Sequence, residues 1–203
     1  MDKGILDLEN KIGLKQGFLQ RLSEEDDWSF IIKLHALFEA VCTHLLLYHF
    51  KEPRLKDVLS RLELSNQSTG KIAFLEATEL IGEFERKYIR KLSELRNKLV
   101  HDVKNTNFSL KGLVESFNDK ELTAFVKTFS PHEVFTIEIN KQHHYKHIPK
   151  NYDINMLKKR ALNNPKDYMI VGAHNVLVDI VDAHSFSDYK QWIKAKEIFD
   201  EEV

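Results

Sequence analysis

The segment WSFIIKLHALFEAVCTHLLLYHF, Trp28–Phe50, decides the fold expected for this chain. Its apolar side chains recur at steps of three and four residues, which places them on one stripe of an α-helix. The stripe consists of Ile31, Leu34, Phe38, Val41, Leu45 and Tyr48, and it is widened by Leu37, Leu46 and Leu47. A helix with so wide an apolar face packs on more than one side. The sequence therefore predicts that this helix lies at the centre of a helical bundle.

Helical spacing continues on both sides of this segment. The further helices that we expect cover residues 5–22, 56–64, 72–80, 84–99, 110–117 and 120–129. Asn164-Pro165 is typical of a helix start, since a capping residue is followed by proline in the first turn. The apolar helix that begins there is expected to run to His184. These patterns together predict an all-α, up-and-down helical bundle.

One segment departs from the helical pattern. Phe135, Ile137 and Ile139 alternate with polar residues, which is the spacing of a strand. We expect residues 145–148 to pair back on it, so that a small β-hairpin forms near 133–148. The predicted organisation is one domain over 1–203. It has a core at 5–130 and 165–184, a peripheral segment at 131–164 and a C-terminal tail at 185–203.

The composition sets limits on partners and compartment. Thirty basic and 31 acidic residues give a net charge of -1, so any nucleic acid would have to be bound by a local patch. The single cysteine, Cys42, excludes an internal disulfide and fits a reducing cytosol. We see no secretion signal and no apolar run of about 20 residues. The expectation is a cytoplasmic protein with no membrane partner.

The segment RNKLVHD, residues 96–102, lies where the 84–99 helix should end. Arginine can hold a phosphate through two parallel hydrogen bonds, and histidine can move a proton near neutral pH. Such a pair can cut RNA without a metal. Asn97 lies one helical turn before His101, whereas Arg96 is about 140° away from His101 around an ideal helix. Arg96 and His101 could meet only if the helix frays at its end, or if a second copy of the chain supplies the partner.

A purely structural interpretation of this segment stays open. Seven arginines offer 21 positions for a histidine four to six residues later, and with 10 histidines in 203 residues about one match is expected at random. Arginine or histidine near a helix C-terminus can also satisfy free carbonyl groups. Arg96 could equally pair with a glutamate on a neighbouring helix.

The motif and the order of elements together resemble the HEPN superfamily, whose signature is an arginine, a polar residue and a histidine four to six positions after the arginine. The layout of Trp28–Phe50, then Leu64–Ile72, then the helix that ends in Leu95–His101 is similar to that of mannitol-repressor-like members. The resemblance covers residues 5–130 and the helix at 165–184. It implies an up-and-down bundle with the motif near the start or end of a core helix.

The resemblance implies two alternative functions. Many HEPN proteins are metal-independent ribonucleases of toxin–antitoxin, phage-defence or RNA-processing systems, with an active site shared by two protomers about a two-fold axis. On this interpretation Arg96 clamps the scissile phosphate, His101 is the general acid or base, and Asn97 orients one of them. This interpretation implies a homodimer that binds an RNA substrate and needs no cofactor. An antitoxin or regulatory protein is a further candidate partner. The mannitol-repressor-like branch implies instead a non-catalytic regulatory or protein-interaction module.

Three lysines are further candidates for contact with RNA: Lys98 and Lys104 near the motif, and Lys146 in the locally basic hairpin segment. The run His143-His144-Tyr145-Lys146-His147 suggests a metal site at first sight. However, neighbouring side chains of a strand point to opposite faces, and the run contains no carboxylate or cysteine. We therefore expect no metal site there.

Overall fold

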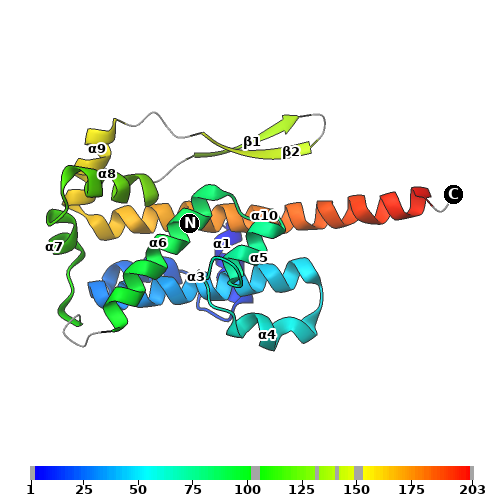
Figure 1. Ribbon diagram of the computed structural model, residues 1–203, viewed down its shortest axis with the longest axis horizontal. Helices are drawn as coiled ribbons and strands as arrows, with labels where there is room; N and C mark the ends of the chain where they lie inside the picture. Colours follow the sequence, from blue (N-terminus) through cyan, green and yellow to red (C-terminus); the bar gives the residue numbers. More distant parts are fainter. Residues whose placement is uncertain (1–2, 102–105, 131–132, 140–141, 149–152, 202–203) are drawn as a thin grey trace.

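The computed structural model describes the backbone of residues 3–101, 106–130, 133–139, 142–148 and 153–201, and no side chains at 131–152, 185–186 and 189–201. Its helices are α1 (Lys3–Lys11), α2 (Phe18–Arg21), α3 (Asp27–Phe50), α4 (Lys56–Arg61), α5 (Lys71–Ala77), α6 (Glu83–Val100), α7 (Leu110–Glu115), α8 (Asp119–Thr128), α9 (Ile154–Asn163) and α10 (Pro165–Glu201). Short 3-10 turns cover Leu22–Glu24 and Pro53–Leu55. The prediction of an all-α bundle is confirmed (Figure 1).

α3 is the central helix, as its apolar pattern predicts. It begins at Asp27 because the Asp26 carboxylate accepts a hydrogen bond from the backbone N–H of Ser29 at 2.9 Å. It ends where Lys51 adopts a left-handed conformation, with φ 51°. Its buried side chains pack against α4, α5, α6 and α10. By length and composition alone α3 could cross a bilayer, with a mean hydropathy of 1.6, but half of that window is buried inside the bundle.

Tyr88 of α6 joins several elements at one point. Its ring lies 5.5 Å from that of Phe38 in α3 and 5.0 Å, edge-on, from that of Phe129, which follows α8. Its hydroxyl donates a hydrogen bond to the Met169 carbonyl of α10 at 2.7 Å. Burial raises the pKa of the phenol well above its ordinary value, so the hydroxyl keeps the proton that it donates.

The structure differs in two respects from the expected division of the chain. α9 lies within the region expected to be peripheral, but its Leu157 and Ala161 are buried in the common core. α10 does not end at His184; it continues to Glu201 as one helix of 37 residues. Figure 1 shows the end of α10 extending past the other helices. The tail at 185–203 is therefore a continuation of a core helix through Glu201.

The expected hairpin is present. β1 (Glu133–Ile139) pairs antiparallel with β2 (Gln142–Ile148), with Glu133 opposite Ile148 and Ile139 opposite Gln142. The alternating pattern of the first strand accounts for this pairing. In Figure 1 the hairpin lies outside the layers of helices, and β1 approaches α10.

A substitution at Gly172 tests how closely α10 packs against α6 and Phe129. A Cβ atom at this position would lie 2.5 Å from the Phe129 carbonyl oxygen and 3.0 Å from Cε2 of Tyr88. Backbone cannot move aside without cost, so Gly172→Ala should lower the free energy of unfolding by about 1–3 kcal/mol. Urea denaturation followed by circular dichroism measures this change.

Gly112→Ala in α7 is the matched control. There a Cβ would be 3.6 Å from Cβ of Ser109, an ordinary contact. Alanine in a helix should then be neutral or stabilising by up to about 1 kcal/mol. Unchanged stability of Gly172→Ala would contradict the packing described here.

Candidate functional site

The motif lies at the C-terminal end of α6. α6 remains helical through Val100, and His101 is the capping residue, with φ -84° and ψ -10°. Leu99 is buried in the core, and the indole N–H of Trp28 points to its carbonyl oxygen at 3.5 Å. Trp28 thus connects the end of α6 to the start of α3 and supplies a donor to one carbonyl of the last turn.

The side chains of the motif differ in exposure. Asn97, Lys98 and His101 are exposed, whereas Arg96 is half-buried. One guanidinium nitrogen of Arg96 donates to the Asn97 side-chain oxygen at 3.1 Å. The structure therefore brings Arg96 and Asn97 together. No hydrogen bond between Arg96 and His101 occurs in the described part of the chain. Because α6 does not fray before His101, the two side chains keep the separation of about 140° around the helix axis that the sequence predicts.

Arg96 belongs to a group of charges between α3 and α6 that the sequence did not indicate. We call His35, Glu39, Lys71 and Arg96 the α3–α6 charge cluster. His35 is 9% exposed, and burial lowers its pKa; the positive charge of Arg96 lowers it further, and Glu39 opposes these effects. His35 therefore remains a neutral imidazole close to Arg96 at pH 7. The sequence alone did not indicate the relation of His35 to Arg96, because it depends on how α3 packs on α6.

The inner part of the cluster is an ion pair. The Lys71 side chain is fully buried, and its ammonium group lies 3.0 Å from a carboxylate oxygen of Glu39. It also donates a hydrogen bond to the Ser60 carbonyl at 3.2 Å. The Glu39 side chain is 41% exposed. The ion pair thus reaches from the core to the surface between α3 and α5.

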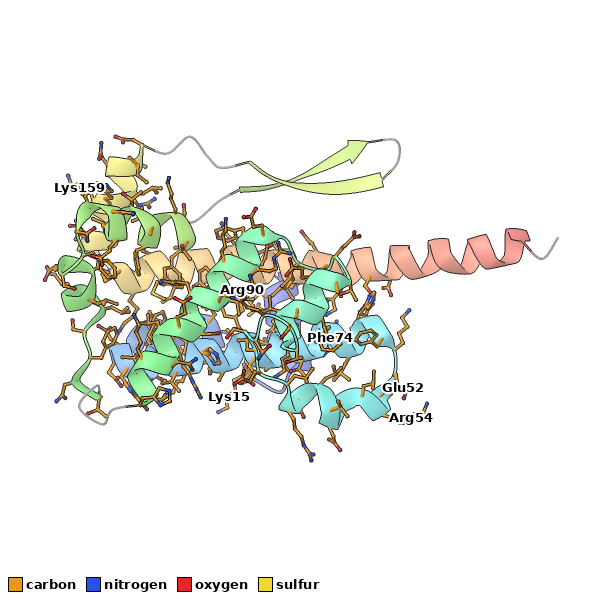
Figure 2. All side chains as sticks on the ribbon, in the orientation of Figure 1. Lys15, Glu52, Arg54, Phe74, Arg90 and Lys159 are labelled. Carbon is orange, nitrogen blue, oxygen red and sulfur yellow. The ribbon has the colours of Figure 1, made fainter. Side chains whose placement is uncertain are left out.

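Two other arginines of α6 are engaged by one carboxylate. Glu76 of α5 lies 2.8 Å from Arg86 and 3.5 Å from Arg90, which Figure 2 labels on α6. These ion pairs connect α5 to α6. Arg86 and Arg90 are therefore less suited than Arg96 to bind a phosphate.

The remaining candidates from the sequence fall partly outside the described residues. Lys98 is exposed on α6. Lys104 lies outside the described residues, and Lys146 lies in β2 without a described side chain, so their contact with RNA stays a prediction. His143 and His144 face Glu138 and Ile137 in the hairpin register. Among the residues whose side chains are described, no group of three or more His, Cys, Asp or Glu could hold a metal ion.

Cys42 is a poor nucleophile in this fold. It is buried in α3, and burial raises the pKa of its thiol to about 12. The thiolate, which is the reactive form, is therefore scarce near neutral pH. Cys42 therefore acts as a small buried apolar side chain of the core.

Comparison with known proteins gives no assignment. No family model, no curated protein sequence and no solved structure matches this chain. The HEPN resemblance therefore stays a prediction from the motif and the order of elements. The function has to be inferred from the residues at the end of α6 and from their surroundings.

Removing Glu39 should destabilise the protein more than removing Lys71, its partner in the ion pair. Glu39→Gln leaves a fully buried ammonium group without its carboxylate, so we expect the free energy of unfolding to fall by about 2 kcal/mol. This is less than the roughly 3–5 kcal/mol for breaking a fully buried pair, because the glutamine amide oxygen can still accept a hydrogen bond. Urea denaturation at pH 7 measures the change.

Lys71→Met is the matched variant. It leaves only the partly exposed Glu39 carboxylate, which water can solvate, and methionine fills much of the same volume. Its cost should be under about 1 kcal/mol. A larger loss for Lys71→Met than for Glu39→Gln would contradict the arrangement of this pair.

Proposed function

We propose that the protein is a metal-independent endoribonuclease of the HEPN type. In this proposal it acts as a homodimer in the cytoplasm, within a toxin–antitoxin or phage-defence system. The observation that carries the proposal is the placement of Arg96, Asn97 and His101 at the end of α6, where Arg96 is half-buried and the other two are exposed. A phosphate ligand can reach such a group without any rearrangement of the core.

The chemistry assigned to these residues is acid–base cleavage of RNA. The 2′-oxygen of the RNA attacks the adjacent phosphorus, and the bond from phosphorus to the 5′-oxygen breaks. The products are a cyclic phosphate and a 5′-hydroxyl. One imidazole removes the proton of the 2′-hydroxyl, and a second gives a proton to the leaving oxygen. The Arg96 guanidinium stabilises the charge that develops on the phosphate, and its hydrogen bond to Asn97 orients it.

Two copies of the chain are needed for this chemistry. Within one chain Arg96 and His101 point in directions about 140° apart, and each chain supplies one His101. A two-fold axis near the end of α6 would place Arg96 of one copy beside His101 of the other. Val100, an apolar residue that is 40% exposed between these side chains, would be covered by such a contact.

The alternative is a non-catalytic regulatory or protein-interaction module, as the mannitol-repressor-like layout implies. The net charge of -1 favours this alternative, since it gives RNA little long-range attraction. On this interpretation the exposed Val100 and its polar neighbours bind a protein, and Arg96 has only a structural role.

Cleavage of RNA in EDTA separates the two functions. Wild-type protein should cut single-stranded or structured RNA without a metal, and His101→Ala and Arg96→Ala should each lower the rate at least 100-fold, the lower range for loss of general acid–base or electrostatic catalysis. Labelled RNA resolved on denaturing gels measures the rates. Arg61→Ala, which removes an exposed arginine of α4, is the control and should cut like wild type.

The other outcomes of this assay are also informative. Equal cleavage by wild type and His101→Ala would point to a contaminating nuclease. A pure wild-type protein that cuts neither RNA would favour the regulatory module.

A further inference from the structure

α3 and α10 are joined at the end of α3 that is remote from the motif. In Figure 1 the C-terminal ends of α3 and α10 lie toward one side of the molecule, and the end of α6 lies toward the other. The ring of His184 in α10 is centred 5.4 Å from the ring of His44 and 4.8 Å, edge-on, from that of Tyr48, both in α3. We call His44, Tyr48 and His184 the histidine latch.

Polar contacts next to the latch complete the junction. The Tyr48 hydroxyl donates to the Asp188 carboxylate at 2.5 Å, and the Lys51 ammonium lies 3.4 Å from the same carboxylate. Nδ1 of His49 lies 2.8 Å from the Ser187 hydroxyl oxygen. Beyond these residues α10 extends past the other helices (Figure 1). The latch and its neighbours therefore set the point at which α10 leaves the bundle.

Both imidazoles of the latch are placed to remain neutral. Nδ1 of His184 lies 2.9 Å from the Ile180 carbonyl oxygen, which can only accept, so Nδ1 carries the hydrogen and Nε2 is the unprotonated nitrogen. Nε2 of His44 and Nε2 of His184 are both buried, and neither has a hydrogen-bond partner among the described residues. A proton added at Nε2 of His184 would thus be buried without an acceptor, which is costly.

The charges around the latch do not compensate for such a proton. Lys11 of α1 acts on both imidazoles as a positive charge. Asp188 of α10 interacts electrostatically with His184, but its carboxylate is engaged by Tyr48 and Lys51.

A shallow hollow of about 380 Å³ beside His44 is lined by Leu47, Tyr48, Lys51, Glu52, Pro53 and Lys56. Its carboxylate, Glu52, is held by Arg54 at 2.6 Å, and Figure 2 shows both at the turn after α3. Lys51 and Lys56 add further positive charge. No carboxylate of this hollow is therefore available to stabilise an imidazolium.

We propose that the contact between His44 and His184 is a proton-sensitive latch, which holds α10 on α3 at neutral pH and releases the helix from residue 184 onward in acid. Two imidazolium groups about 5 Å apart repel each other, and the buried nitrogens have no acceptor for the added protons. This proposal is independent of the ribonuclease proposal, because the two sites lie at opposite ends of α3.

The direction of the pH effect follows from burial. Burial lowers the pKa of His44, with Lys11 adding to the effect. Burial also lowers the pKa of His184, opposed by the Ile180 carbonyl and assisted by His44 and Lys11. In the released state both histidines titrate near the ordinary value of about 6.5. The latched state therefore loses stability as the pH falls below about 6.5 and keeps it above that pH.

Hydrogen exchange on the full chain tests the latch. At pH 5.5 and 7.5, with correction for intrinsic exchange rates, peptides that cover residues 180–188 should lose protection at the lower pH. The expected loss is about tenfold for each histidine that stays neutral when latched. Peptides from the middle of α6 should change much less, which distinguishes local release from global unfolding.

His184→Phe keeps a ring in the junction but has no site for a proton, so the loss of protection at 180–188 should be about tenfold smaller than in wild type, which leaves the share due to His44. His174→Gln, on the same helix but outside the latch, should leave the wild-type pH dependence intact. Equal protection at both pH values in wild type, or full pH dependence in His184→Phe, would overturn the proposal. Should His184→Phe fold poorly, proton NMR titration of the wild-type histidines decides the question. The pKa values of His44 and His184 must then lie below the ordinary value of about 6.5.

Discussion

The buried Tyr88 hydroxyl is the constraint on which the position of α6 depends. A phenol that is fully buried must find an acceptor for its O–H, and the Met169 carbonyl of α10 is that acceptor. The aromatic contacts with Phe38 and Phe129 hold the same ring against α3 and the end of α8. Gly172 lets the α10 backbone approach closely enough for this arrangement. The direction of α6, and with it the place where the motif emerges, is thereby determined.

α3 connects the two functional proposals because it carries polar side chains of two separate groups. His35 and Glu39 are one turn apart and interact with Lys71 and Arg96, near the end of α6. His44 and Tyr48 are also one turn apart and contact α10. Buried polar groups are costly unless they are paired. The α3–α6 charge cluster meets this requirement with an ion pair. The histidine latch keeps its imidazoles neutral, which lowers the cost, but both buried Nε2 atoms lack a hydrogen-bond partner among the described residues.

The features that the sequence predicted correctly depend on local periodicity. The stripe in Trp28–Phe50 identified the central helix, and the alternation around Ile137 identified the first strand of the hairpin. The prediction that the last helix ends at His184 was wrong, although no glycine or proline follows Gly172 in the chain to end it.

Other features could not be predicted from one sequence. The influence of Arg96 on His35 depends on the packing of two helices that are distant along the chain. So does the contact of His44 with His184, which joins residues far apart in sequence. The motif predicted correctly that His101 lies at a helix end. Its proposed catalytic role, however, depends on a second copy of the chain.

Subunit complementation tests the central claim most directly. Arg96→Ala and His101→Ala proteins, each inactive alone, are mixed under conditions in which native mass spectrometry shows exchange of subunits, and RNA cleavage is assayed in EDTA. If the site uses Arg96 of one copy and His101 of the other, the mixture should recover part of the wild-type activity. A mixture that exchanges subunits but stays inactive, beside an active wild type, would contradict the shared site.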